Sequence, residues 1–158
     1  MLPGEAYRLY QPVDIAPVLA VLGKIEFVPV NIGSTVPWRS PCYVPSPGSL
    51  LPPEIPAFVA GLGLGGESKR ILLRKLGPRQ GMAPHVDEAF AGEEDWRRFQ
   101  VPLVTDPRII MRWPDDGQEA HLAAGWLYEV RFDRLHEVLN GADIDRVHLQ
   151  IDQVNATI

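Results

Sequence analysis

The sequence predicts a mainly β protein, a barrel or jelly roll, and three observations support that prediction. Sixteen prolines and fourteen glycines make up about a fifth of the 158 residues, whereas the two together average about 12% in proteins. From residue 69 onward, short apolar runs alternate with turn sequences. No stretch long enough for an ordinary helix separates these runs, so a β barrel is favoured over alternating strands and helices.

The first 66 residues are expected to form an irregular, proline-rich segment that wraps around the barrel. Within it, residues 13–23 predict a short helix that has a proline in its first turn and ends at a glycine. Residues 24–30 alternate like a strand, and Pro29 restricts this strand to a sheet edge or a bulge. Residues 36–56 hold seven prolines and predict little regular structure.

Residues 67–158 are expected to form the barrel core of a single domain that spans residues 1–158. Eight strands are predicted, in the order Lys69–Leu76, Met82–Asp87, Arg97–Thr105, Arg108–Trp113, Glu119–Ala123, Trp126–Phe132, Leu135–Leu139 and Arg146–Asp152. The third and the last alternate apolar and polar side chains. Their apolar faces are expected in a core, while their polar faces, which include Arg98 and His148, face either bulk water or a wet cavity.

Several classes of function are disfavoured by composition. The formal charge is −5 and no basic stripe follows the chain, so a nucleic-acid partner is not expected. No apolar run approaches the length of a membrane span and no signal peptide opens the chain. Cys42 is the single cysteine, which suits a reducing compartment, and we expect a cytoplasmic protein of unknown oligomeric state.

A glycine-rich stretch, residues 61–66, formally satisfies G-x-G-x-x-G. A dinucleotide site of this type needs a strand just before the glycines and a helix just after them. Prolines precede this stretch and a predicted strand follows it. We therefore expect a flexible connector here.

The residues that carry chemistry begin with the pair His85 and Asp87. They lie two positions apart at the end of a predicted strand, so both side chains project from one face and can converge on one ion. His136, in the predicted strand 135–139, supplies a third ligand. Two histidines and one carboxylate on one face of a metal leave positions open, an arrangement that suits non-haem Fe(II).

Arg146 comes ten residues after His136, at the start of the next predicted strand. Asn140 and Gly141 form the turn that folds these two strands together. Folding across this turn brings Arg146 near the metal but not onto it. A guanidinium there can hold a distal carboxylate through a bidentate ion pair, which is more directional than a lysine contact.

Taken in order, these residues resemble a known family. The H-x-D pair, the later histidine and arginine, the eight strand runs, and the stretches 98–107 (RFQVPLVTDP) and 132–152 (FDRLHEVLNGADIDRVHLQID) are similar to the aspartyl/asparaginyl β-hydroxylase group. Members of that group are Fe(II)- and 2-oxoglutarate-dependent oxygenases on a double-stranded β-helix, a cupin-like jelly roll. The resemblance covers about residues 70–152 and implies the same fold and chemistry for this chain.

The resemblance also implies a role for each matching residue. His85, Asp87 and His136 would bind iron, from the second and seventh strands of the barrel. Arg146 would bind the C5 carboxylate of 2-oxoglutarate, and Arg98 resembles a second family arginine near the same pocket. Some members have glycine at the position of Asp87. The carboxylate here makes the chain more similar to members that hydroxylate free amino acids of the proline type.

The predicted function is hydroxylation of an unactivated C–H bond of an amino acid, a peptide side chain or another small molecule. The expected cofactors are Fe(II), 2-oxoglutarate and O2, with ascorbate as a candidate auxiliary reductant. His148 shares a strand face with Arg146 and is either a hydrogen-bond donor to the cosubstrate or a satisfied cavity histidine.

Two alternatives keep the fold. A cupin-like hydrolase or isomerase would use the same three ligands with zinc or manganese. A non-catalytic β-barrel binding module would retain no metal. Arg146 favours the oxygenase over the hydrolase, because a hydrolase needs no carboxylate anchor at that place.

Overall fold

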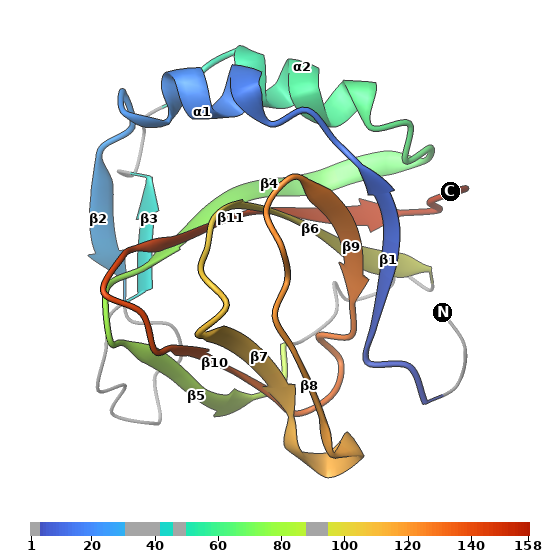
Figure 1. Cartoon of the computed structure of the whole chain (residues 1–158). Coiled ribbons are helices and arrows are strands. Elements are labelled where there is room, and N and C mark those ends of the chain that lie inside the picture. The colour runs from blue at the N-terminus through green and yellow to red at the C-terminus, as the bar shows by residue number, and fades with distance from the viewer. Residues whose placement is uncertain (1–3, 31–41, 46–49, 88–94) are drawn as a thin grey trace.

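The computed structural model describes residues 4–30, 42–45, 50–87 and 95–158 and consists of two antiparallel sheets (Figure 1). The larger sheet has seven strands in the order β1-β9-β6-β11-β4-β3-β2, and the smaller has four in the order β5-β10-β7-β8. The fold class is therefore mainly β, as the sequence predicts.

The eight strands predicted after residue 66 are all present, with ends shifted by no more than three residues. They are β4 (Glu67–Leu76), β5 (Gly81–His85), β6 (Trp96–Val104), β7 (Ile109–Trp113), β8 (Gln118–Ala120), β9 (Trp126–Val130), β10 (His136–Asn140) and β11 (Arg146–Val154). A short 3-10 helix, Pro114–Asp116, joins β7 to β8. Short apolar runs bounded by turn sequences were a sufficient signal for these strands.

The N-terminal segment is more regular than the sequence indicates. It holds β1 (Tyr7–Pro12), α1 (Ala16–Leu22), β2 (Phe27–Val30), β3 (Cys42–Pro45) and α2 (Glu54–Gly61). Helix α1 and strand β2 were predicted, and β2 lies at the edge of the large sheet, where Pro29 leaves no interior hydrogen bond unmade. Strands β1 and β3 and helix α2 were not. Residues 36–41 and 46–49 of the proline-rich stretch lie outside the described residues.

Helix α2 shows why prolines misled the prediction. Pro53 caps the helix and Pro56 lies in its first turn, where the missing N–H has no partner within the helix to lose. Helix α1 has a similar start: the Asp14 carboxylate accepts a hydrogen bond from the Ala16 N–H at 3.0 Å. Proline-rich sequence therefore initiates a helix here and does not exclude one.

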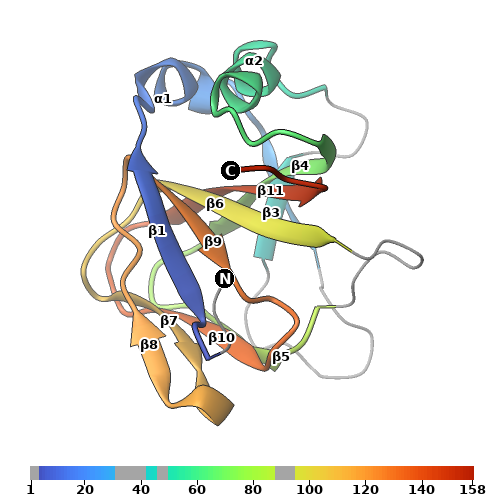
Figure 2. The same cartoon turned by 90° about the vertical axis from the view of Figure 1, so that its right-hand side faces the viewer.

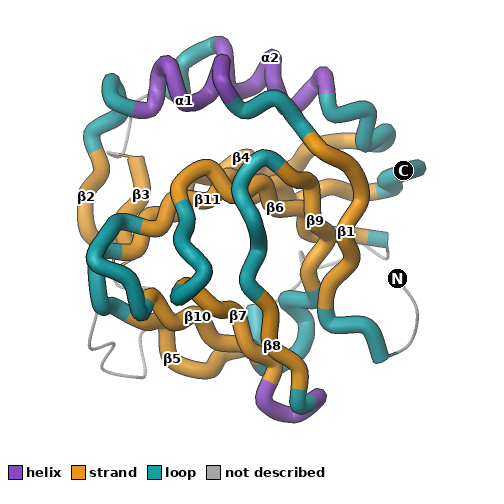
Figure 3. The backbone as a smooth tube through the Cα atoms, viewed as in Figure 1, coloured by secondary structure: helices purple, strands orange, loops and turns teal. Residues whose placement is uncertain are grey.

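The molecule has three layers, with the two helices on the outer face of the seven-stranded sheet and the four-stranded sheet on the other side (Figures 2 and 3). Val18, Ile55 and Val59 of the helices pack on that outer face. The sheet residues in this cluster include Leu73, Phe99, Val101, Leu127, Leu149 and Ile151. The apolar faces of β6 and β11 are thus used by the helices, which leaves their polar faces directed between the two sheets.

The glycine-rich connector from α2 to β4 is packed, not flexible. Leu62 and Leu64 are buried, and the Thr157 N–H donates to the Leu64 carbonyl at 2.9 Å. Gly66 has φ +62°, and a side chain there would collide with the Val154 carbonyl at the end of β11. The glycines let the connector pass close to the C-terminal strand, and they form no dinucleotide fingerprint, because a helix precedes them and a strand follows.

Candidate metal centre

Strands β5 and β10 bring the two candidate histidine ligands together. The strands pair antiparallel, and His85 and His136 lie directly opposite each other in the register. Their ring centroids are 4.3 Å apart. Residues opposite each other in an antiparallel pair project from the same face, so both imidazoles lie on the inner face of the small sheet.

Asp87 joins this pair from the chain just beyond the end of β5. Its backbone N–H donates to the Phe132 carbonyl at 3.0 Å, which fixes the residue beside the segment leading into β10. Its Oδ1 lies 3.5 Å from Nε2 of His85, and one donor atom from each of His85, Asp87 and His136 lies within 4.8 Å of the other two. The structure therefore brings together the three residues that the sequence singles out.

Both imidazoles are oriented by the backbone. Nδ1 of His85 lies 2.8 Å from the Ala83 carbonyl oxygen, and Nδ1 of His136 lies 2.8 Å from that of Arg134. A carbonyl only accepts, so each Nδ1 carries the proton of this hydrogen bond, and in the neutral ring Nε2 is then the nitrogen with the lone pair. Burial lowers the pKa of His136 to about 4, which keeps this ring neutral at ordinary pH. Two imidazole Nε2 atoms and a carboxylate are a donor set that fits a divalent transition metal.

Arg98 binds the third candidate ligand. It donates from Nη1 to Oδ2 of Asp87 and from Nε to Oδ1 of Asp152, the latter at 2.7 Å. Asp152 is fully buried and also pairs with the half-buried Arg70. Positive and negative side chains therefore alternate in the order Arg70, Asp152, Arg98 and Asp87. The Arg98 guanidinium also lies 4.5 Å from the ring centroid of Phe132. All of these contacts fix its position.

This contact controls the charge of Asp87. Burial opposes ionisation of the carboxyl, but the nearby Arg98 guanidinium outweighs it and holds the pKa of Asp87 below its usual range. Asp87 is therefore an anion at neutral pH, with Oδ1 on the side of His85. Arg98 lines the cavity, where the resemblance puts it, and its nitrogens are engaged by two carboxylates.

Arg146 and His148 lie deep in the cavity, on β11. They are 4% and 3% exposed. Nδ1 of His148 lies 2.9 Å from Nη2 of Arg146 and 2.9 Å from Oε1 of Gln100 on β6. Burial, and then the charges of Arg146 and His121, lower the pKa of His148 well below its usual range, so the ring is neutral. Its Nε2 is buried and has no hydrogen-bond partner within the described structure.

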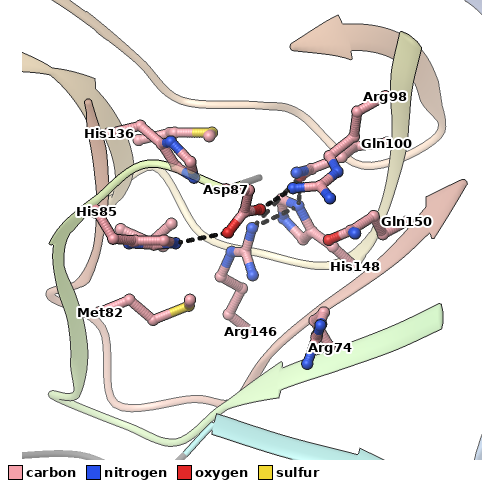
Figure 4. Close-up of a pocket in the computed structure, with 12 residues that line it drawn as sticks. Arg74, Met82, His85, Asp87, Arg98, Gln100, His136, Arg146, His148 and Gln150 are labelled. Atoms are coloured by element: carbon pink, nitrogen blue, oxygen red, sulfur yellow. Dashed lines mark hydrogen bonds and ion pairs between the residues drawn. The ribbon is translucent and has the colours of Figure 1, made fainter. Parts of the chain in front are cut away.

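The polar faces of β6 and β11 therefore line a cavity between the sheets and do not face bulk water (Figure 4). With its open mouth, the cavity holds about 510 Å³ of empty space. Arg98, His148 and Arg146 lie on the seven-stranded side. The complete lining is Arg74, Met82, His85, Asp87, Arg98, Gln100, Met111, His136, Val138, Arg146, His148 and Gln150.

Sequence reasoning did not assign Arg74 or Asp152 to the site. Arg74 lines the cavity from β4, and Asp152 holds Arg98 from the end of β11. A signal for Asp152 was available, because it continues the alternation of Arg146 and His148 along one strand face. The signal for Arg74 was weaker: burial does not alternate regularly along β4, and no motif marks that position.

Comparisons with known proteins show the fold. No protein-family model matches the chain, and no curated protein matches it. Among solved structures, a prolyl-4-hydroxylase from Pseudomonas putida is 18% identical, over 95% of this chain and 93% of its own, with a TM-score of 0.60.

Two further solved structures are similar. One is a predicted oxalate decarboxylase from Thermotoga maritima, 15% identical over 82% of this chain and 94% of its own, with a TM-score of 0.49. The other is a cupin domain from Bordetella pertussis Tohama I, 20% identical over 57% and 86%, with a TM-score of 0.40.

The two antiparallel sheets and the prolyl-4-hydroxylase likeness define this chain as a cupin-like, double-stranded β-helix protein. Within that fold, His85, Asp87 and His136 form a group able to hold a metal ion. None of the helices in the described ranges is long and apolar enough to cross a membrane.

Proposed function

We propose that this protein is an Fe(II)- and 2-oxoglutarate-dependent oxygenase that hydroxylates an unactivated C–H bond of an amino acid, a peptide side chain or another small molecule. One observation carries the proposal: a 2-His-1-carboxylate group shares a cavity with a buried arginine, Arg146, from the opposite sheet. Three protein ligands leave coordination positions for a chelating cosubstrate and for O2.

The chain's own residues would divide the work in the following way. Nε2 of His85, Nε2 of His136 and the Asp87 carboxylate would hold the ion. When bound, iron would supply the redox chemistry that couples decarboxylation of 2-oxoglutarate to succinate with oxidation of a C–H bond. Arg146 would hold the C5 carboxylate, and the unpartnered Nε2 of His148 is available to the same ligand or to a water.

Other lining residues would protect the reaction. Met82, Met111 and Val138 are apolar and line the cavity from the small sheet, so they limit access of water to the ion. Arg98 would keep the Asp87 carboxylate ionised and oriented toward the ion. Residues that hydrogen-bond to metal ligands commonly have this role. The aspartyl/asparaginyl β-hydroxylase resemblance supports the same roles, and the prolyl-4-hydroxylase likeness supports the fold that they need.

Arg146 separates this proposal from the two alternatives. A metal hydrolase or isomerase has no need of a deeply buried guanidinium beside the ion. A binding module has no need of the paired backbone contacts that orient both histidines. The proposal therefore rests on the combination of oriented ligands and a carboxylate anchor, and not on the fold.

The experiment that tests it is release of succinate from 2-oxoglutarate in the presence of Fe(II) and ascorbate. We expect His136→Ala to abolish turnover because one of three ligands is lost. Arg146→Ala should raise the 2-oxoglutarate requirement at least tenfold and leave iron affinity within about threefold. Arg112→Ala, which removes an exposed guanidinium from β7, is the matched control and should change neither.

Three results would contradict the proposal. Turnover that survives His136→Ala would remove the triad from the chemistry. A wild-type protein that binds zinc or manganese but never 2-oxoglutarate would favour the hydrolase reading. Loss of all metal during purification, with no affinity on readdition, would favour the binding module.

A further inference from the structure

We propose that Arg74 recognises an acidic group of the prime substrate, so that the substrate class is a small molecule bearing a carboxylate. The inference rests on the proposed function, because it assumes that Arg146 holds the cosubstrate. It starts from the distribution of charge on the cavity wall.

Three guanidiniums line the cavity, and only two of them have partners among the described residues. Arg98 is paired with Asp87 and Asp152. Arg146 contacts His148 and Gln100. Arg74 makes no hydrogen bond or ion pair within the part of the chain that the structure describes, and Figure 4 shows it apart from the other labelled side chains, with no interaction drawn to it. One cation therefore remains for a ligand.

The position of Arg74 is that of a binding residue rather than a surface residue. It lies on β4 directly opposite His148 of β11, with its side chain in the cavity lining and only partly exposed. The next residue, Lys75, belongs to the opposite face, where it pairs with Asp145 at 2.9 Å. Strand alternation thus places Lys75, which has a counter-charge, on one face and Arg74, which has none among the described residues, on the other.

The net charge of the cavity also favours an anionic substrate. Arg74, Arg98 and Arg146 face one lining carboxylate, Asp87, and a second carboxylate, Asp152, pairs with Arg98 from behind. A divalent ion would be balanced by the two carboxylates of 2-oxoglutarate. The surplus of positive charge then remains, and a guanidinium with free donors binds a carboxylate through two parallel hydrogen bonds.

Depth distinguishes Arg74 from the cosubstrate anchor. Arg146 is 4% exposed, whereas Arg74 is only partly buried. A cosubstrate that enters first occupies the deep position, and a substrate that enters later meets the more accessible cation. We therefore assign the carboxylate of the cosubstrate to Arg146 and that of the substrate to Arg74.

The test observes the arginine directly by NMR, with no need for turnover. The protein is loaded with Zn(II), a diamagnetic stand-in for iron, and with saturating 2-oxoglutarate. The Arg74 Nε–Hε signal is identified by its absence in Arg74→Gln. We expect acetate to shift this signal with at least tenfold higher affinity than it shifts the signals of exposed arginines, and acetamide, its uncharged isostere, to have no effect.

Calorimetry on the same samples completes the test. Arg74→Gln should leave 2-oxoglutarate affinity within about threefold of wild type, and so should Lys75→Gln, the control from the opposite face of the strand. If Arg74→Gln instead weakens 2-oxoglutarate binding tenfold or more, Arg74 is a cosubstrate contact and the inference is wrong. It is also overturned if acetate and acetamide act alike, or if neither shifts the signal.

Failure of the proposed function has a different signature. Wild-type protein would then bind no 2-oxoglutarate with any metal, whether or not acetate shifts the Arg74 signal. Acetate binding at Arg74 in that protein would still support a site for acidic molecules, while the oxygenase assignment would be lost.

Discussion

At the scale of single residues, the state of Asp87 depends on a charge that lies two contacts away. Arg98 pairs with Asp87, and Asp152 holds and neutralises Arg98 from its other side. A guanidinium without that second partner would draw the Asp87 carboxylate more strongly and would add an uncompensated positive charge near the ion. Asp152 is thus expected to favour metal binding without touching the metal.

Asp152→Asn tests this role. The substitution keeps the shape but removes one charge from a fully buried pair, so we expect a loss of about 3 kcal/mol in the free energy of unfolding and a loss of about tenfold in Mn(II) affinity. Denaturant unfolding and metal titration measure the two effects. Asp143→Asn, which changes an exposed carboxylate, is the control. If Asp152→Asn is destabilised but its folded fraction binds Mn(II) with wild-type affinity, Asp152 has a structural role only.

His148 gives a prediction in pH. Burial and Arg146 lower its pKa in the folded protein, while the unfolded chain has a pKa near 6.5. Below that pH the unfolded chain binds more protons than the folded one, so stability falls with falling pH. Between pH 7 and pH 5 this group should reduce the free energy of unfolding by about 2 kcal/mol.

The pKa of His136 is also lowered by burial, so its contribution to stability falls in the same direction. Comparing His148→Gln with wild type, both without metal, isolates the contribution of His148. Urea unfolding at pH 7 and pH 5 should show a smaller difference for His148→Gln than for wild type, by about 2 kcal/mol. Equal differences for the two proteins would mean that His148 is protonated or solvated in the fold, contrary to its burial.

The residue scale also shows where sequence reasoning stops. His85, Asp87 and His136 were recognisable because an i, i+2 pair on a strand shares a face, and because a further histidine lies in a later predicted strand, in the order that the family resemblance repeats. Arg74 was not recognisable from the sequence. It stands out only because no counter-charge from the described residues lies next to it in the packed cavity, and no sequence pattern predicts that.

At the scale of elements, the turn after β10 sets the distance between the candidate ligands and the anchor. Asn140 lies at the end of β10, and Nδ2 of its side chain donates to the carbonyl oxygens of Gly77 and Ile144, both at 2.8 Å. Its Oδ1 accepts from the Ala142 N–H at 3.0 Å. One buried amide thus joins the β4–β5 turn to the β10–β11 turn, and so fixes β5, β10 and β11 relative to one another.

Asn140→Ala should therefore affect both the fold and the site. The substitution leaves buried carbonyls and an N–H without partners, at about 1–3 kcal/mol for such a group. We expect the free energy of unfolding to fall by about 3 kcal/mol and 2-oxoglutarate affinity to fall severalfold, because Arg146 follows the turn. Urea unfolding and calorimetry check the two effects. Glu119→Ala, an exposed site on β8, should change neither, and a neutral Asn140→Ala would contradict the role.

Helices and strands were predictable where the local pattern of apolar and polar residues matches the burial of each face in the fold. Strand β11 repeats apolar and polar residues, and its two faces do pack in a helix-covered core and a cavity. Strand β1 carries no such pattern, since it lies at a sheet edge with Tyr7 and Leu9 exposed. Helix α2 begins among prolines whose pattern resembles that of a loop. Tertiary position, and not propensity, decided these elements.

At the scale of the whole molecule, the main apolar core and the candidate site occupy opposite faces of one sheet. The helices and the outer face of the seven-stranded sheet form a continuous apolar cluster. The inner face of the same sheet supplies Arg98, Arg146 and His148 to the cavity. Each of β6 and β11 serves both layers, because successive side chains point in opposite directions.

Ile55→Ala tests this separation. Ile55 of α2 is fully buried in the outer cluster, so its truncation should lower the free energy of unfolding by about 2–5 kcal/mol. The cavity lies on the other side of the sheet, and we expect metal and 2-oxoglutarate affinities per folded molecule to stay within about twofold of wild type. Denaturant unfolding and calorimetry measure both. Leu19→Ala, an exposed position on α1, is the control. A tenfold loss of affinity in Ile55→Ala would show that the sheet transmits packing defects from its helical face to the ligands, so the two layers would not be independent.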